Sequence, residues 1–85
     1  MKPYALIWQP AAVAGLIRLR SADAQAARAV RTAVSSLAED AEPSSSTPLG
    51  SGSLRRLRVA DARILYEVDH TRRAVHILTV GQVRR

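Results

Sequence analysis

The fold is decided by residues 53–68, which read Ser53-Leu54-Arg55-Arg56-Leu57-Arg58-Val59-Ala60-Asp61-Ala62-Arg63-Ile64-Leu65-Tyr66-Glu67-Val68. Two β-type runs meet at Ala60-Asp61, and a connection of either two or four residues there predicts a β-hairpin with Arg58 directly opposite Arg63. The same register places Arg56 across from Leu65 on one face. The other face then collects the residues suited to a core, which are Leu57, Ile64 and Tyr66. Tyr66 is therefore expected to be buried under a helix.

The arginine face of this hairpin indicates a surface that binds phosphate. Like charges directly opposite one another destabilise a sheet by about 0.2–1 kcal/mol. A polyanion bound between Arg58 and Arg63 removes that cost. Arg56, on the same face, extends the cationic surface.

The length and composition of the chain indicate one small domain over residues 1–85, with a single modest core. The chain has no cysteine, and its two histidines are His70 and His76, so we expect neither a disulfide, nor a structural metal site, nor a cofactor. No apolar run approaches the roughly 20 residues of a membrane span, and the N-terminus lacks the pattern of a secretion signal. A cytoplasmic protein without membrane contact is the expectation.

The net charge of +6 is concentrated in the C-terminal part of the chain. Residues 1–53 carry five basic and four acidic groups, whereas residues 54–85 carry eight arginines against Asp61, Glu67 and Asp69. Arginine suits planar, bidentate contacts with phosphate better than lysine does. A GC-rich genome also favours arginine over lysine, but it does not explain this clustering.

The remaining segments predict an α+β fold with the element order βααβββ. A strand over 4–8 precedes a helix over 11–20 with Pro10 at its first position, in which Val13, Leu16, Ile17 and Arg20 recur at helical spacing and Gly15 is a mild weakness. Ser21 is the expected N-cap of a second helix that runs to about Ala41. The Pro/Ser/Gly-rich residues 43–53 are expected to form a flexible loop. After the hairpin, a turn at 70–73 leads to a last strand over 74–80, giving an antiparallel sheet of three to four strands packed on the two helices.

A second pair of functional residues follows from the register of the last two strands. A four-residue turn from His70 to Arg73 places Glu67 opposite His76, on the same face as Arg63. A histidine beside a carboxylate is a frequent general acid or base, so His76 is the candidate for proton transfer and Glu67 for its orientation. The alternative is that Glu67 bridges to a neighbouring arginine and His76 is an ordinary strand residue.

The order of elements and several short motifs together resemble the RelE/ParE superfamily of bacterial type II toxins. The matching pieces are the strand and Pro-Ala step at 4–11, Leu49-Gly50, the arginine hairpin through Tyr66-Glu67-Val68, and Ile77 to Gly81. The resemblance implies a toxin that is inhibited by a cognate antitoxin. In the RelE branch the exposed sheet face cleaves messenger RNA on the ribosome without a metal, and in the ParE branch the target is DNA gyrase.

Carried over onto this sequence, the resemblance marks Arg56 and Arg58 as the basic pair before the turn, Arg63 as the arginine after it, and Arg84 as the basic residue near the family's position after the last strand. The favoured reading is an endoribonuclease that inhibits translation, with Arg58, Arg63, His76 and Glu67 as catalytic candidates and Arg56, Arg58, Arg63 and Arg84 as RNA-binding candidates. The alternatives are a gyrase inhibitor that acts by protein binding, and a catalytically degenerate paralogue that binds only the antitoxin.

Overall fold

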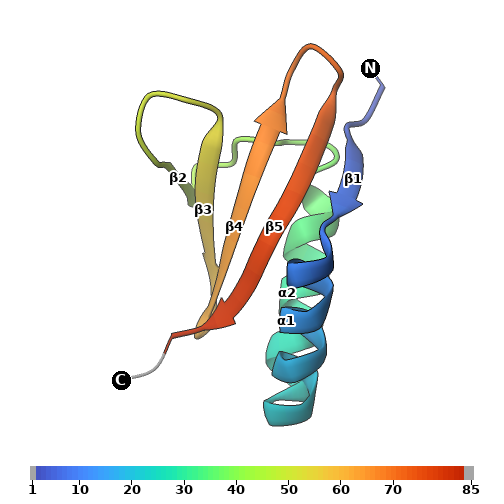
Figure 1. Cartoon of the computed structure of the whole chain (residues 1–85), viewed down its shortest axis with the longest axis vertical. Coiled ribbons are helices and arrows are strands. Elements are labelled where there is room, and N and C mark those ends of the chain that lie inside the picture. The colour runs from blue at the N-terminus through green and yellow to red at the C-terminus, as the bar shows by residue number, and fades with distance from the viewer. Residues whose placement is uncertain (1, 84–85) are drawn as a thin grey trace.

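Two helices and a five-stranded sheet make up the computed structural model, which describes residues 2–83 (Figure 1). The elements in chain order are β1 (Ala5–Trp8), α1 (Pro10–Ala22), α2 (Ala24–Ser36), β2 (Ser46–Pro48), β3 (Leu54–Val59), β4 (Ala62–Asp69) and β5 (Ala74–Gln82). The spatial order of the strands is β1-β5-β4-β3-β2, with β1 parallel to β5 and every other pair antiparallel. The α+β class and the two N-terminal helices agree with the prediction.

The sheet is larger than predicted, and it is mixed rather than antiparallel. β1 reaches the sheet through the two-helix connection, so no tight turn forces it to run antiparallel to its neighbour β5. β2 lies inside the segment 43–53, for which no strand was expected. It forms because Ser46–Pro48 pairs with the open edge of β3, and Ser46 is buried there with its Oγ 2.8 Å from the carbonyl oxygen of Pro43.

The helix boundaries also differ from the prediction. Ser21 belongs to α1, where its hydroxyl donates to the carbonyl oxygen of Ile17. The N-cap of α2 is Asp23, whose carboxylate accepts a hydrogen bond of 3.1 Å from the backbone N–H of Ala26. α2 ends at Ser36 rather than near Ala41, and a short series of turns follows it.

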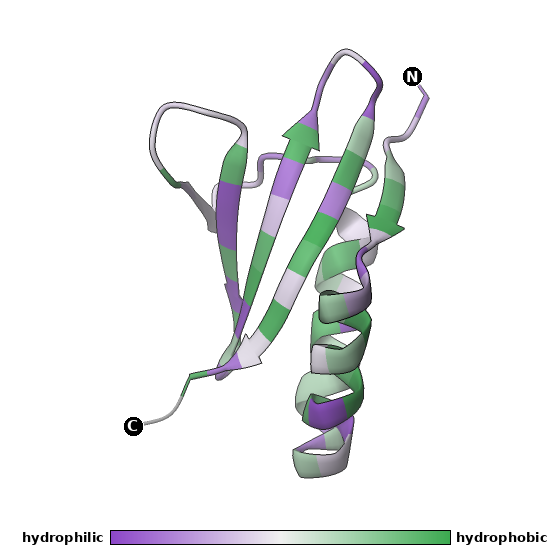
Figure 2. Ribbon diagram, in the orientation of Figure 1, coloured by the Kyte–Doolittle hydropathy of each residue, from purple (hydrophilic) through white to green (hydrophobic). Residues whose placement is uncertain are grey.

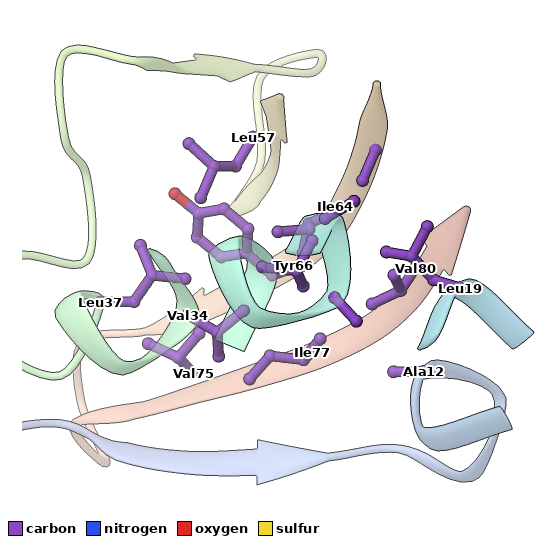
Figure 3. Close-up of a cluster of buried hydrophobic side chains, with 14 of the residues drawn as sticks. Ala12, Leu19, Val34, Leu37, Leu57, Ile64, Tyr66, Val75, Ile77 and Val80 are labelled. Carbon is purple, nitrogen blue, oxygen red and sulfur yellow. The ribbon is translucent and has the colours of Figure 1, made fainter. Parts of the chain in front are cut away.

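One face of the sheet packs against both helices and forms the core (Figure 3). Tyr66 is fully buried in this core, and its hydroxyl donates a hydrogen bond of 2.9 Å to the carbonyl oxygen of Ala41. The prediction that Tyr66 is buried under a helix, on the same face of the hairpin as Leu57 and Ile64, is confirmed. The cluster drawn in Figure 3 includes Ala12, Leu19, Val34, Leu37, Leu57, Ile64, Tyr66, Val75, Ile77 and Val80.

The buried face of α1 combines two small residues with one leucine, and it is not the face that the predicted spacing of Val13 and Ile17 marked. Its buried residues are Ala12, Gly15 and Leu19. A Cβ at Gly15 would lie 2.1 Å from the carbonyl oxygen of Val80, so the missing side chain permits the close approach of α1 to β5. Gly15, expected to be a weakness of the helix, is thus a packing requirement. The large apolar side chains of α1 that stay outside are Val13 and Ile17, with 42% and 51% exposure. Neither helix of the described chain is long and apolar enough to cross a membrane.

Candidate nucleic-acid interface

The sheet face turned away from the helices carries the arginines of the hairpin. Side chains alternate along β4, so Arg63 and Glu67 are exposed while Ile64 and Tyr66 are buried. Figure 2 shows this alternation as hydrophilic and hydrophobic bands along the strands. No helix of the described chain covers this face, so its charged groups are available to a partner.

The register of the hairpin is the one predicted from the sequence. Arg58 pairs with Arg63, Arg56 pairs with Leu65, and the turn consists of Ala60 and Asp61. Ala60 takes up a left-handed conformation with φ of 53°, as a two-residue hairpin turn requires. The tight turn therefore fixes which arginines share the open face.

A β-bulge between β4 and β5 shapes the same face. Leu65 pairs with Thr79 while Tyr66 pairs with Ile77, so Leu78 is an extra residue on β5. Because the bulge shifts the alternation by one residue, both Ile77 and Val80 point into the core. The shift also brings Thr79 and Gly81 onto the open face beside Leu65 and Arg63, which the sequence pattern did not predict.

An open hollow of about 520 Å³ lies on this face, and Arg56 and Arg63 both line it. The rest of its wall is formed by Leu49, Leu65, Thr79, Val80, Gly81, Gln82 and Val83. Arg58 instead lines a second hollow of about 340 Å³, together with Leu37 and Asp40 on the helix side of the molecule. β2 pairs only with Arg55–Leu57, so β3 has an open edge at Arg58. The structure therefore brings Arg56 and Arg63 together but places Arg58 at a different hollow.

The arginines of β3 differ in their partners. Arg55 points to the helix side, where its Nε donates to Ser46 Oγ at 2.9 Å and its Nη1 lies 3.9 Å from Glu42 Oε2. Within residues 2–83, Arg56, Arg58 and Arg63 form no ion pair with any carboxylate. The structure thus separates one arginine used for internal packing from three that remain available for an external anion.

Glu67 and His76 are directly opposite one another on β4 and β5, as predicted. Their side chains form neither a hydrogen bond nor an ion pair in the described part of the chain. The imidazole of His76 has its Nδ1 3.5 Å from Nε2 of Gln9 instead, and Gln9 is the residue between β1 and α1. Sequence reasoning missed Gln9, because only the parallel pairing of β1 with β5 brings it beside His76.

Two further observations bear on the expected site residues. Arg84 lies outside the described residues, so its expected place beside the RNA stays a prediction. Residues 2–83 contain no group of three or more His, Asp or Glu side chains that could hold a metal ion.

The fold of this chain is similar to that of several solved structures. The chain is similar to one in the toxin–antitoxin complex RelBE2 of Mycobacterium tuberculosis, with 23% identity, a TM-score of 0.80, and coverage of 94% of this chain and 98% of that chain. It is similar to the isolated RelE toxin of E. coli, with 15% identity, a TM-score of 0.82, and coverage of 96% and 86%. It is also similar to a chain of the chromosomal ParDE system of P. aeruginosa, with 17% identity, a TM-score of 0.77, and coverage of 95% and 97%. At these identities the likeness shows the fold alone.

The sequence itself gives the family. A comparison with curated proteins finds no match. The model of the ParE toxin of type II toxin–antitoxin systems, however, matches residues 6–85, nearly the whole chain. The chain therefore belongs to the ParE toxin family, within the RelE/ParE superfamily of type II toxins.

Proposed function

We propose that this toxin cleaves messenger RNA on the ribosome without a metal, and that it thereby inhibits translation until a cognate antitoxin binds it. Its membership of a toxin family accounts for the toxic role. The observation that supports RNA as the target is that Arg56 and Arg63 both line one open hollow. Neither forms an ion pair with a carboxylate in residues 2–83.

In this proposal Arg56 and Arg63 together hold one phosphate. Arg56 lies opposite Leu65, two residues along β4 from Arg63, so the two are diagonal neighbours with Cα atoms about 7–8 Å apart. Both guanidinium groups can reach a phosphate between them, and their fixed positive charge stabilises the negative charge that develops on phosphorus. Arg58, directly opposite Arg63, and Arg84 would contact the neighbouring stretch of the RNA backbone.

Proton transfer requires another residue, because a guanidinium stays protonated and has no acceptor atom. His76 is the candidate. It pairs with Glu67, two residues along β4 from Leu65, which corresponds to about 7 Å along the strand. A 2′-hydroxyl next to a phosphate held by Arg56 and Arg63 would lie between that phosphate and the imidazole of His76. In this proposal Gln9 orients the imidazole through its contact with Nδ1. Glu67 orients it from the directly opposite position on β4.

A cognate antitoxin fits the charge of the molecule. Arg56 and Arg63 on the open sheet face, and Arg58 at the edge of β3, form no ion pair within the described chain, so an acidic segment that covers them would relieve their mutual repulsion. The solved relatives include complexes of a toxin with its antitoxin. The antitoxin would compete with RNA for the same groups.

A second candidate function is inhibition of DNA gyrase by protein binding. It is favoured by the exposed apolar side chains Val13 and Ile17 on α1, which suit a protein partner better than a nucleic acid. This function needs no proton transfer and would survive the loss of His76.

One experiment separates the two functions. The purified toxin is added to a ribosome-programmed translation mixture, in which breaks in the messenger RNA are mapped, and in parallel to a gyrase supercoiling assay. Arg63→Ala tests the site, and Arg28→Ala, an exposed arginine on α2, is the matched control. Breaks that appear with wild type and Arg28→Ala, are lost with Arg63→Ala, and leave supercoiling unaffected support the proposal. Blocked supercoiling with intact messages overturns it in favour of gyrase, and no effect in either assay overturns both.

A further inference from the structure

We infer that Thr47 is a phosphorylation site, and that a phosphate on its hydroxyl binds Arg56 and thereby blocks the open sheet face. The effect on RNA binding rests on the proposed function, whereas the contact between the phosphate and Arg56 is independent of it. The acceptor residue belongs to β2, the short edge strand, and no residue of β2 lines the hollow between Arg56 and Arg63.

Thr47 and Arg56 face one another across the ladder between β2 and β3. They are Cα partners in this antiparallel pair, and both residues are exposed. The next pair, Ser46 and Leu57, is buried on the helix side, so strand alternation puts Thr47 and Arg56 on the open face. Side chains directly opposite one another have Cβ atoms about 4.5–5.5 Å apart. A phosphate on Thr47 is therefore within reach of the guanidinium of Arg56.

Neither group has another partner that would prevent this contact. Arg56 forms no ion pair within residues 2–83. The hydroxyl of Thr47 forms no hydrogen bond in the same residues, whereas the buried hydroxyl of Ser46 donates to the carbonyl oxygen of Pro43 and accepts from Nε of Arg55. Of the two hydroxyl groups of β2, the one on Thr47 is thus the one that a modifying enzyme can reach.

The backbone of β2 suits a segment that an enzyme must take up. β2 has three residues, lies at the edge of the sheet and pairs only with β3 (Figure 1). Pro48 has no N–H, so it donates no hydrogen bond to the ladder. Short segments at an exposed edge open locally at a lower free energy than core strands do. An enzyme can therefore bind the chain around Thr47 in an extended form while the core stays folded.

Other hydroxyl groups near the arginines fit less well. Thr79 is also on the open face, but it belongs to β5, which is paired on both sides and cannot leave the sheet. Ser45 is exposed but lines the second hollow together with Asp40, whose carboxylate would repel a phosphate. Thr47 alone among these three combines an edge position with an arginine directly opposite.

The modifying reaction is transfer of the γ-phosphoryl group of ATP by a protein kinase. Oγ1 of Thr47 forms a bond to the γ-phosphorus, the bond from that phosphorus to the bridging oxygen of the departing ADP breaks, and the hydroxyl proton passes to a base of the kinase. The product carries about −1.5 to −2 charge at pH 7 and has three acceptor oxygens. Opposite an arginine, such a group forms roughly one to three charge-assisted hydrogen bonds.

The phosphate would inhibit the toxin by imitating its substrate. It presents to Arg56 the same group that this arginine holds in the proposed function. Because it is attached to the same chain, its effective concentration at Arg56 is high and dissolved RNA competes with it poorly. Its negative charge also opposes the approach of another polyanion to Arg63, the diagonal neighbour of Arg56.

The test uses the full chain made by chemical synthesis with a phosphate on Thr47. A phosphate on Ser51 is the matched control, because Ser51 is exposed in the loop after β2 and does not line the hollow. Phosphorus NMR follows the ionisation of each phosphate, in the wild-type and the Arg56→Ala backgrounds. Fluorescence anisotropy measures the affinity for a short single-stranded RNA. Mass spectrometry of the toxin isolated from its native cells, in growth and in starvation, shows whether Thr47 carries phosphate.

The phosphate on Thr47 is expected to have a pKa lower by about 1 or more than in Arg56→Ala, since a nearby opposite charge favours the dianion. It should weaken RNA binding at least about tenfold, and the phosphate on Ser51 by no more than about twofold. Thr47→Val, which accepts no phosphate, should bind RNA as the unmodified wild type does. Native toxin should carry phosphate on Thr47.

Three results would overturn the inference. Equal pKa values in the two backgrounds exclude the contact with Arg56, and unchanged RNA affinity with a lowered pKa excludes the regulation. Native toxin without phosphate on Thr47 in both conditions excludes the modification. If the unmodified toxin binds no RNA, the proposed function is contradicted instead, and phosphorus NMR still decides whether Thr47 and Arg56 form the pair.

Discussion

The hydroxyl of Tyr4 lies 2.6 Å from Nδ1 of His70, and the other ring nitrogen, Nε2, lies 3.1 Å from Oε2 of Glu42. One imidazole thus joins three segments that are far apart in the sequence. Tyr4 precedes β1, Glu42 follows α2, and His70 begins the turn between β4 and β5. The guanidinium of Arg73, 4.5 Å from the centre of the Tyr4 ring, adds a cation–π contact to the cluster. The cluster ties the parallel edge strand β1 to the rest of the sheet.

Replacing His70 with alanine should therefore loosen the N-terminal strand. Both hydrogen bonds are exposed, so each bond removed should lower the free energy of unfolding by no more than about 0.5–1.5 kcal/mol. Chemical denaturation measures the total, and amide hydrogen exchange of β1 shows where it acts. Thr71→Ala, an exposed change in the same turn, is the control. If His70→Ala matched this control in both measurements, the cluster would have no role in stability.

Gly15→Ala should destabilise the protein, although alanine is the better helix former. Helix propensity alone predicts a gain of roughly 0.5–1 kcal/mol. The new methyl group would instead lie 2.1 Å from the carbonyl oxygen of Val80 and force α1 away from β5, at a cost of about 1–3 kcal/mol. The melting temperature measured by thermal unfolding shows whether Gly15→Ala stabilises or destabilises the protein. A raised melting temperature would contradict the close packing of α1 on the sheet.

Tyr66→Phe should cost about 1–3 kcal/mol in unfolding free energy. The hydroxyl of Tyr66 donates to the carbonyl oxygen of Ala41 in a buried place, so its removal leaves that carbonyl without this partner. Urea denaturation of wild type and Tyr66→Phe measures the difference. Tyr4→Phe, which removes a more exposed hydroxyl, should cost less.

Arg56→Ala and Arg63→Ala should each weaken RNA binding and reduce its dependence on salt. Every phosphate contact to a single strand contributes about −0.7 to the slope of log K against log salt concentration. Each substitution should make the slope less negative by about that amount, which fluorescence anisotropy measures at several salt concentrations. Arg28→Ala, on the helix side, should leave the slope unchanged. Equal slopes for all four proteins would exclude the sheet face as the RNA-binding surface.

His76→Ala should slow RNA cleavage strongly while leaving RNA binding nearly intact. General acid–base groups typically contribute 10²–10⁴-fold to the rate. We therefore expect a loss of at least about a hundredfold in a ribosome-programmed cleavage assay, with a much smaller change in affinity. Gln9→Ala should reduce the rate less, since it only removes a contact 3.5 Å from Nδ1 of His76. Wild-type cleavage by His76→Ala would refute the assigned role and leave Glu67 and the arginines to explain any activity.

What the sequence alone determined is the hairpin: its short turn at Ala60-Asp61, the pairing of Arg58 with Arg63, and the burial of Tyr66 all follow from strand alternation between residues close in the chain. Such patterns are local, so they can be read without knowing the rest of the fold. The two consecutive helices also followed from local signals, but their boundaries, the cap at Ser21 and the buried face of α1 did not, since Asp23 is the cap and Val13 and Ile17 are exposed.

The tertiary structure alone decided what depends on segments far apart in the chain. The parallel pairing of β1 with β5 brings Gln9 to His76, and the open edge of β3 recruits Ser46–Pro48 as β2. The bulge at Leu78 determines which residues of β5 face the hollow, because packing against the helices requires both Ile77 and Val80 inside. The separation of Arg58 from Arg56 and Arg63 has the same origin, since the extent of β2, not the sequence of β3, leaves the edge at Arg58 open.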